Sequence, residues 1–514
     1  LWSPTLVARR SRCGRAVVPI VLAMSSPAAR PTALRARLRE HRWSFAVFGA
    51  LLVLFATWVI GVPRYAAPDE PAHVIKAFGT ARGETIGDPI DGASPLVRWF
   101  DGPAALASGN PGCYAFSPGI PASCAVATSD RTWIQLDTSA ATYPPWYYAV
   151  VGGAARLTGQ DTSVRAQRTA SAIASALVVT AALTIAARLG RRRPAALLVA
   201  LTPMAVFLLP MVNPNAWEIS GVLLVWVMLA RLHLREDPPD RQALLAVSAV
   251  AALAVVVRPV ALAWVAVAFA AYALVDRRLW QPDRRATHRT LGIAAIPLAV
   301  AVVASSMWSR YAGVGLADDR YAADLGRIEL FRAGFGRSAW LFEQAVGVLG
   351  WADTWIPNSA AALVIVGLVS AGALVWFAAD ERVRWILVGL VAVWLLYPAI
   401  YVTITGTPEV WQGRYNLPLL GGLAFCLLLA AAAPTGAAPF ERLAPLLVVS
   451  FVVAESLAFH QMLRRYMVGS GGDILLSDPA WYPSVSAWLL ITVNVAAAAT
   501  LGVLTLRSPE QADR

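Results

Sequence analysis

Apolar runs recur along the whole of this 514-residue chain, and short polar segments rich in arginine separate them. A run of about 17–25 apolar residues can cross the hydrocarbon core of a bilayer, and it must be helical because lipid cannot hydrogen-bond the backbone. The pattern predicts an all-α integral membrane protein with roughly 12 transmembrane helices and further helices in its outer loops. The expected spans are residues 44–62, 168–188, 194–211, 216–233, 242–257, 259–276, 291–308, 358–378, 385–404, 417–433, 443–460 and 486–506.

The apolar segment 144–157 decides the topology, because counting it as a crossing would move Arg191, Arg192 and Arg193 to the outer side. The segment is short for a span and has an aromatic edge suited to the headgroup level, so we interpret it as a non-spanning helix. Every strongly basic cluster then falls on one side of the membrane, as the positive-inside rule requires. This register predicts a multi-pass protein of the plasma membrane with both termini in the cytoplasm.

The expected organisation is one polytopic membrane domain, residues 44–506, with large outer loops at 63–167 and 309–357. Residues 1–43 are expected to form a basic cytoplasmic tail, and residues 507–514 are expected to be cytoplasmic as well. The apolar run 16–23 is marginal as a signal peptide. Because the printed chain starts at Leu1, we interpret residues 1–23 as a misassigned start, with Met24 as the first residue.

Composition supports the membrane interpretation and narrows the class. Hydrophobic residues make up 58% of the chain and charged residues 14%, against roughly 25% charged in soluble proteins. The net charge of +12 does not indicate nucleic acid binding, because the arginines cluster between apolar runs. Lys76 is the only lysine, and the abundance of Ala, Arg and Gly is typical of a high-GC bacterial genome.

Two of the four cysteines, Cys113 and Cys124, lie in one polar loop. If that loop is outside the cytoplasm, a disulfide between them is expected, and a pair of free thiols is the alternative. Cys426 lies in the middle of a predicted span and is expected to be a small packing residue.

The segment Pro68-Asp69-Glu70-Pro71-Ala72-His73 follows the first span at the outer membrane edge. A carboxylate followed by proline is a good helix start, so a capped surface helix from here to Arg82, stopped by Gly83, is one interpretation. The alternative is chemical. Two adjacent carboxylates with a histidine three and four positions on can form a general-base or metal site.

This segment resembles part of a bacterial family of multi-span proteins catalogued as domain of unknown function 2142. Four further segments resemble that family in the same order, so the resemblance covers roughly residues 44–505. They are YPPWYY at 143–148, NPNA at 213–216, LGWADTWIP at 349–357 and WQGRYNLP at 411–418.

The family in turn resembles the GT-C glycosyltransferases, multi-span enzymes that use polyprenyl-phosphate-linked sugars and keep an acidic residue in the first outer loop. The resemblance implies Asp69 as catalytic base and Glu70 as its helper, with His73 nearby in substrate binding. Such enzymes often carry an acidic residue in the turn after the third span. Here that turn reads Asn213-Pro214-Asn215, with Glu218 slightly later, which argues against a metal ligand there.

The leaving group of this chemistry is a lipid-linked phosphate, so cationic groups are needed where its charge develops. Arginine binds phosphate with a bidentate fork, and the candidates at the outer edge are Arg64, Arg258 and Arg414, with Tyr415 as a hydrogen-bond donor. Arg258 interrupts an apolar stretch, where a charge usually faces a cavity, although it can also mark a hairpin tip and snorkel. Arg414 can equally be a loop-packing arginine.

Trp351 and Asp353 in the second outer loop are of residue types that bind sugars, although tryptophan is common at any membrane interface. The sequence has no P-loop, dinucleotide fingerprint or cysteine-rich metal motif. No cofactor is therefore assigned, and a divalent cation at the carboxylates stays open. The expected partners are a polyprenyl-phosphate sugar donor, a glycan, lipid or protein acceptor, and the lipid bilayer.

Two other functions stay open. A transporter or flippase of lipid-linked glycans would also need intramembrane arginines, and internal repeats or discontinuous helices would favour it. A non-catalytic assembly protein of the cell envelope is the third interpretation. The leading expectation is a glycosyltransferase that works on the outer face.

Overall fold

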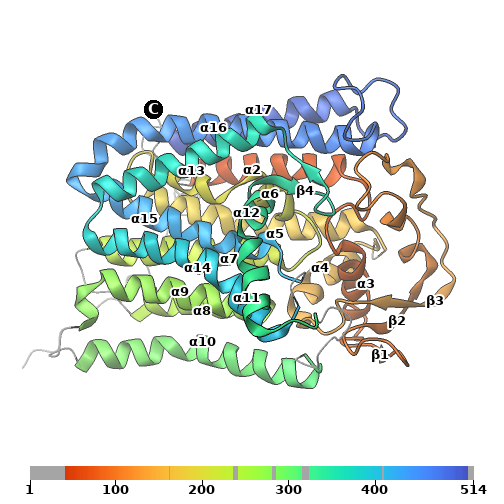
Figure 1. The fold of residues 1–514 in the computed structure, drawn as a ribbon, viewed down its shortest axis with the longest axis horizontal. Helices are drawn as coiled ribbons and strands as arrows, with labels where there is room; N and C mark the ends of the chain where they lie inside the picture. The colour runs from red at the N-terminus through yellow and green to blue at the C-terminus, as the bar shows by residue number, and fades with distance from the viewer. Residues whose placement is uncertain are drawn as a thin grey trace, which may run out of the picture. The chain divides into compact units, whose positions relative to one another are not determined.

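The computed structural model describes residues 41–160, 162–235, 241–280, 285–314, 323–407 and 410–507. The expectations for residues 1–40 and 508–514, including the start at Met24, lie outside the described residues. From Trp43 onward the chain forms a single unit of packed helices (Figure 1).

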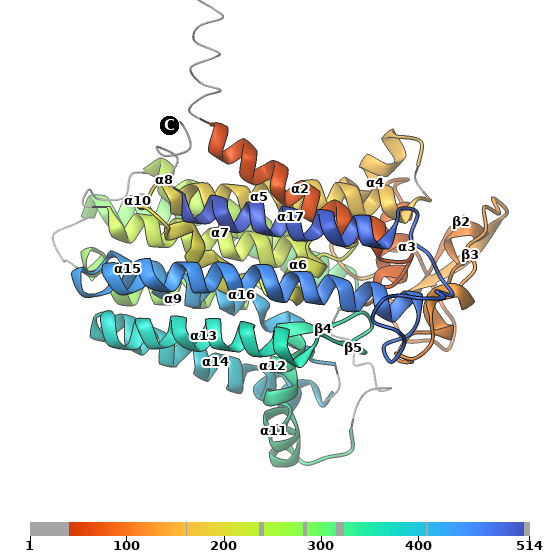
Figure 2. The same cartoon turned by 90° about the horizontal axis from the view of Figure 1, so that it is seen from above.

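Among the described residues, nine helices are long and apolar enough to span a membrane, which confirms a helical membrane protein. Most of them run side by side along one direction (Figures 1 and 2). They are α2 (Arg42–Gly61), α5 (Val164–Ala187), α7 (Asn215–Leu234), α10 (Arg285–Tyr311), α13 (Asn358–Ala378), α14 (Glu381–Thr405), η8 with α15 (Gly413–Leu419 and Leu420–Ala432), α16 (Pro434–Met467) and α17 (Ala487–Leu506).

The other three predicted spans are shorter or broken. Helices α8 (Arg241–Val257) and α9 (Ala261–Val275) have only 17 and 15 residues. The segment expected at 194–211 is discontinuous, because it consists of the 3₁₀ helix η5 (Arg193–Ala200) and the short helix α6 (Pro203–Leu208). Proline lacks the amide hydrogen that a helix interior needs, so Pro203 is poorly suited to a continuous helix here. It lies instead in the first turn of α6, where that hydrogen would have no partner.

The arginine-bearing turns lie together at one end of the bundle. Arg192 forms an ion pair with Glu441 at 3.1 Å, and Arg193 donates to the carbonyl of Leu428 at 3.1 Å. Further contacts of this kind are Arg278 to the Leu232 carbonyl and Arg382 to the Leu274 carbonyl. Turns that the charge pattern placed on one side of the membrane are therefore neighbours in space.

The opposite end carries the long connections, and we call it the loop end. Its first segment contains helix α3 and a three-stranded antiparallel sheet in the order β1-β2-β3. The disulfide between Cys113 and Cys124 closes a loop between β2 and β3. The elements of this segment are α3 (Glu70–Thr80), β1 (Asp88–Pro89), β2 (Arg98–Pro103), η2 (Ala104–Leu106), η3 (Pro111–Cys113), η4 (Ala122–Cys124), β3 (Trp133–Thr138) and α4 (Pro145–Leu157).

Helix α4 has 13 residues and is not among the span-length helices. It is therefore short for a span, as its sequence indicated, and its non-spanning placement stays a prediction. A second group of loop-end elements follows α10. It comprises α11 (Arg327–Gly336), α12 (Ser338–Gly347) and the hairpin of β4 (Val348–Leu349) with β5 (Thr354–Trp355). The 3₁₀ helix η6 (Arg277–Trp280) lies at the arginine-bearing end.

Small and aromatic residues pack the interior of the bundle. The Gly421 position of α15 faces Trp226 of α7 so closely that a Cβ there would lie 2.6 Å from the indole ring. Cys426 is fully buried with a free thiol, as expected of a packing residue. Glu455 of α16 is also buried, and it accepts a hydrogen bond from Trp58 of α2 at 2.7 Å.

A buried ion pair fixes where the loop end joins the bundle. Arg168 of α5 meets the Glu70 carboxylate at 2.7 Å through Nε and at 2.5 Å through Nη2. The same guanidinium donates to the carbonyls of Val62 and Pro63, both at 2.8 Å. The end of α2, the start of α3 and the first turns of α5 are therefore held by one fully buried side chain.

Replacing Glu70 by Gln leaves the Arg168 charge buried without its carboxylate, which typically costs about 3–5 kcal/mol. We expect the Glu70→Gln protein to unfold at a clearly lower temperature than the wild type in detergent. Glu441→Gln is the matched control, because its ion pair with Arg192 is partly exposed and is worth roughly 0–1 kcal/mol. An equal fall in unfolding temperature in the two variants would show that the buried ion pair contributes no more to stability than the partly exposed one.

Candidate functional site

A cavity of about 600 Å³ opens at the loop end, where α3, α12, the β4–β5 turn and η8 approach one another. Polar, charged and aromatic side chains line it together. The lining residues are Pro68, Asp69, Ala72, His73, Phe116, Ser139, Ala140, Tyr143, Arg337, Trp340, Gln344, Trp351, Ala352, Val410, Gln412, Arg414 and Tyr415.

Five of the residues predicted for substrate binding or catalysis meet at this cavity, and four do not. Those that line it are Asp69, His73, Trp351, Arg414 and Tyr415. Those that lie elsewhere are Arg64, Glu70, Arg258 and Asp353. The roles of all nine stay predictions.

Asp69 stands at the N-cap position of α3, but its side chain makes no capping bond. Its backbone is left-handed, with φ of 60°, a conformation that asparagine, aspartate and glycine adopt more readily than other residues. The expectation that this carboxylate caps the helix is therefore wrong. The side chain is 45% exposed and forms an ion pair with Arg414. Glu70, the next residue, is fully buried and belongs to the ion pair with Arg168.

Arg414 reaches the cavity from η8, and its own surroundings are closely packed. The neighbouring Gly413 has no room for a side chain, because a Cβ there would lie 2.0 Å from the carbonyl oxygen of Leu341. The Gly413 amide donates to the Gln344 side chain at 2.6 Å. Arg414 is only 3% exposed, so its charge is almost removed from water.

Tyr415 lies against two guanidinium groups. The distance from its ring centre is 5.2 Å to the guanidinium carbon of Arg414 and 4.5 Å to that of Arg258. Such cation–π contacts stabilise a cation that has little water around it. The ring thus connects the cavity to a second buried arginine, which does not itself line the cavity.

Arg258 belongs to the turn between α8 and α9, where it is buried and forms an ion pair with Glu218 of α7. Glu218 also accepts hydrogen bonds from Trp264 at 3.0 Å and from Asn215 at 3.2 Å. The acidic residue that follows the Asn213-Pro214-Asn215 turn is therefore the counter-ion of Arg258. A hairpin-tip arginine that snorkels to the surface would be exposed, and this one is not.

Helix α3 presents two buried basic side chains to the loops around it. Nδ1 of His73 lies 2.8 Å from the Tyr148 hydroxyl, and burial lowers the His73 pKa to about 3. Lys76 donates to the carbonyls of Thr85 and Ala141, and burial lowers its pKa to about 7. His73 is therefore neutral at physiological pH, and Lys76 ties α3 to two loops.

An aromatic wall forms another side of the cavity. Trp351 donates its indole N–H to the Tyr65 carbonyl at 2.9 Å, and the Phe116 ring packs edge-on against it at 5.7 Å. Asp353 lies behind this wall, where its carboxylate accepts from Arg465 at 3.0 Å and from the Phe116 amide at 3.1 Å. Asp353 therefore supports the wall from outside the cavity.

Backbone strain gathers at the same place. Seven described residues other than glycine have positive φ, and three of them, Asp69, Phe116 and Ala352, line the cavity. Left-handed conformations cost such residues energy and persist where the surrounding structure imposes them, frequently at functional sites. The carboxylate and the aromatic wall are thus held in unusual conformations on two sides of one space.

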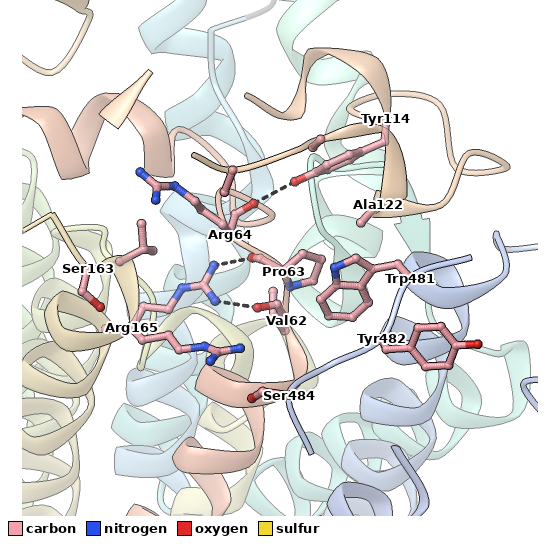
Figure 3. A pocket seen from close by; sticks show the side chains of 14 residues that line it. Val62, Pro63, Arg64, Tyr114, Ala122, Ser163, Arg165, Trp481, Tyr482 and Ser484 are labelled. Atoms are coloured by element: carbon pink, nitrogen blue, oxygen red, sulfur yellow. Dashed lines mark hydrogen bonds between the residues drawn. The ribbon is translucent and has the colours of Figure 1, made fainter. Parts of the chain in front are cut away.

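A second cavity, of about 460 Å³, is bordered by the Val62–Pro63 segment, Trp481 and Tyr482 (Figure 3). Arg64 borders it, but Figure 3 shows its guanidinium turned away from Trp481 and Tyr482. That guanidinium donates to the Tyr65 hydroxyl at 2.7 Å and to the Ala105 carbonyl at 2.8 Å. Arg64 is therefore bound within the loop end and does not line the cavity of Asp69.

Sequence reasoning missed Arg168 and Tyr143. The signal for Arg168 was a charge at the edge of an apolar span, which usually needs a buried partner. Tyr143 was noticed only as part of an aromatic segment, although it lines the cavity edge-on to His73 at 5.4 Å. Within the described ranges, no three His, Cys, Asp or Glu side chains come together as metal ligands.

The sequence matches the family model described as "Predicted membrane protein (DUF2142)" over residues 52–423. No curated protein matches it. Among solved structures, a crystal structure of ArnT from Cupriavidus metallidurans bound to undecaprenyl phosphate is similar, with 15% sequence identity and a TM-score of 0.41. That match covers 93% of this chain and 78% of the ArnT chain.

The low pKa of His73 predicts how stability changes with pH. The unfolded chain takes up a proton on this residue below about pH 6.5, whereas the folded protein does so only near pH 3. Wild type should therefore lose about 2 kcal/mol relative to His73→Gln between pH 7 and pH 5. Thermal unfolding of both proteins at the two pH values measures this change. A stability difference that is independent of pH would contradict a buried, neutral His73.

Proposed function

We propose that this protein, which belongs to the DUF2142 family of predicted membrane proteins, is a membrane glycosyltransferase. It would move a sugar from a polyprenyl-phosphate donor to a glycan, lipid or protein acceptor of the cell envelope. One observation carries the proposal. A half-exposed carboxylate, Asp69, faces a cavity of about 600 Å³ and is paired with the buried arginine Arg414.

Asp69 is our candidate for the general base. The acceptor hydroxyl loses its proton to the carboxylate while its oxygen attacks the anomeric carbon of the donor sugar. The bond from that carbon to the phosphate oxygen breaks, and polyprenyl phosphate leaves with the bonding electrons. Glu70 is less suited to this task, because it is fully buried and both its oxygens are engaged by Arg168.

The leaving phosphate changes from a diester with one negative charge to a monoester with more. A cationic group beside it stabilises the transition state more than the ground state, which is the requirement for catalysis. Arg414 lines the cavity, and Arg258 lies behind Tyr415. We assign Arg414 to phosphate contact and Arg258 to a supporting charge, with the Tyr415 hydroxyl as an additional donor.

The aromatic wall suits the sugar. Trp351 and Phe116 offer apolar ring faces and edges beside polar groups such as Gln412, and pyranose rings have both apolar and hydroxyl-bearing faces. Asp353 is proposed to position this wall through the Phe116 amide rather than to contact sugar. A divalent cation is not needed by this scheme.

The reaction is proposed to occur on the outer face of a bacterial plasma membrane. The arginine-bearing turns would face the cytoplasm under the positive-inside rule, which puts the loop end outside. Both termini would then be cytoplasmic. This location is where lipid-linked sugars would meet envelope acceptors.

The transporter alternative has one observation in its favour, the discontinuous segment of η5 and α6. Broken helices in transporters usually line a polar binding site. Here the small cavity beside the break, about 30 Å³, is lined mainly by aliphatic residues such as Leu198, Val199 and Leu201. The glycosyltransferase proposal accounts better for the charged cavity at the loop end.

Replacing Asp69 by Asn removes the base but keeps the size of the side chain and tolerance of the left-handed backbone. We expect Asp69→Asn to insert and fold normally while losing at least about 100-fold in transfer, the usual contribution of a general base. The measurement is the envelope glycan and glycolipid profile of a strain that lacks the gene and carries either version.

Asp137→Asn serves as the matched control, because Asp137 is an exposed loop-end carboxylate that does not line the cavity. Its glycan profile should equal that of the wild type. A fully restored profile with Asp69→Asn would rule out Asp69 as the base.

A further inference from the structure

We propose that Asp69 occupies the phosphate site of Arg414 while no donor is bound, and that the donor phosphate frees Asp69 by displacing it. The base would then become available only when a phosphate-bearing ligand is in place. This inference rests on the proposed function, because it assigns a regulatory role to the same two residues.

The adjacent carboxylates Asp69 and Glu70 form ion pairs that differ in their exposure to water. Glu70 is fully buried and accepts two hydrogen bonds from Arg168, which also donates to two backbone carbonyls. Four N–H groups of Arg168 are thus engaged, and its side chain is only 1% exposed even though it borders the second cavity. A ligand anion would therefore meet a much better compensated cation here than at Arg414.

The charge of Arg414 is balanced by fewer hydrogen bonds than that of Arg168. Its Nη2 atom donates to Asp69 and lies 3.4 Å from the Tyr415 hydroxyl, and its buried Nε atom has no hydrogen-bond partner among the described residues. Its carboxylate partner is 45% exposed, whereas the guanidinium is almost fully buried. A buried cation with one half-hydrated partner attracts any anion that can offer more oxygens.

The charges around the cavity favour replacement of the Asp69 carboxylate by another anion at Arg414 over its departure without a replacement. Among the described residues that line the cavity, two arginines, Arg337 and Arg414, accompany Asp69, and no other carboxylate does. Arg258 adds a guanidinium 4.5 Å from the Tyr415 ring centre, although Glu218 balances it. Removal of Asp69 from Arg414 would be unfavourable without a replacement, and a phosphate monoester or diester is a suitable one.

Competition between Asp69 and phosphate for Arg414 predicts the direction in which phosphate affinity changes when Asp69 is replaced. If Asp69 and a ligand phosphate use the same donors of Arg414, neutralising Asp69 must tighten phosphate binding. A base that lies beside the phosphate without using Arg414 would also repel it, so its neutralisation would tighten binding by an amount that does not depend on Arg414. The double variant Asp69→Asn with Arg414→Gln therefore separates the two cases, even though it is inactive in transfer. Displacement predicts that the gain of Asp69→Asn disappears when Arg414 is replaced, and a gain that persists there would overturn displacement.

The experiment measures binding of farnesyl phosphate to the purified full-length protein in detergent, by isothermal titration calorimetry. We expect Asp69→Asn to bind roughly fivefold more tightly than the wild type, the effect of one partly exposed ion pair. Arg414→Gln should bind at least about tenfold more weakly, because the phosphate loses a charge-assisted contact. Asp137→Asn, which removes a loop-end charge outside the cavity, should bind as the wild type does.

Farnesol and inorganic phosphate identify which part of the ligand is recognised. Displacement predicts that the gain of Asp69→Asn appears with farnesyl phosphate and with inorganic phosphate, and not with farnesol. Asp69→Gly is a second variant for the same test, because glycine also accepts the left-handed backbone. Thermal unfolding of each variant establishes that it is folded.

The outcomes distinguish the two proposals. Unchanged or weaker binding by both Asp69 variants, with weaker binding by Arg414→Gln, overturns displacement and leaves the proposed function standing. Failure of the folded wild type to bind farnesyl phosphate overturns both. Tighter binding by the Asp69 variants together with unchanged binding by Arg414→Gln would place the phosphate elsewhere and also overturn the inference.

Discussion

The ion pair between Glu70 and Arg168 is the contact on which the loop end depends. It joins α3 to α5 across 98 residues of sequence and also fixes the carbonyls that end α2. Two charges in a dry environment are stable only when each is fully hydrogen-bonded, and here the guanidinium has four contacts. Because Glu70 is held so rigidly, the residue before it has little freedom. Asp69 adopts a left-handed conformation and projects into the cavity.

This arrangement gives two neighbouring carboxylates different tasks. Glu70 belongs to the scaffold, and its charge is permanently neutralised. Asp69 keeps contact with water and with Arg414, whose position depends on the close packing of Gly413 against Leu341. The same division is seen among the arginines, since Arg168 and Arg465 hold the loops whereas Arg414 faces the open cavity. In a membrane protein an unpaired charge is costly, and this is the reason for proposing that the half-compensated Arg414 binds a ligand anion.

Much of the architecture follows from sequence patterns that are local. Span length and the arginine clusters were enough to predict the long helices, the gathering of the basic turns at one end and the shortness of α4. The broken segment 193–208 was not predicted, because its composition is as apolar as that of a continuous span. The partners of Glu70, Arg64 and Asp353 were also beyond the sequence, since each lies far along the chain or depends on side-chain direction. Five segments resembling one family indicated which loops matter, but only the folded chain separates cavity residues from supporting ones.

The most direct test of the central claim is to locate the donor phosphate. A polyprenyl phosphate analogue with a photoreactive group beside the phosphate can be cross-linked to the wild-type protein in membranes and the labelled peptides identified by mass spectrometry. The account predicts label on the segments 68–73, 349–357 or 410–416, and loss of that label in Arg414→Gln. Label concentrated on Trp481, Tyr482 or Ser163, at the second cavity, would contradict it.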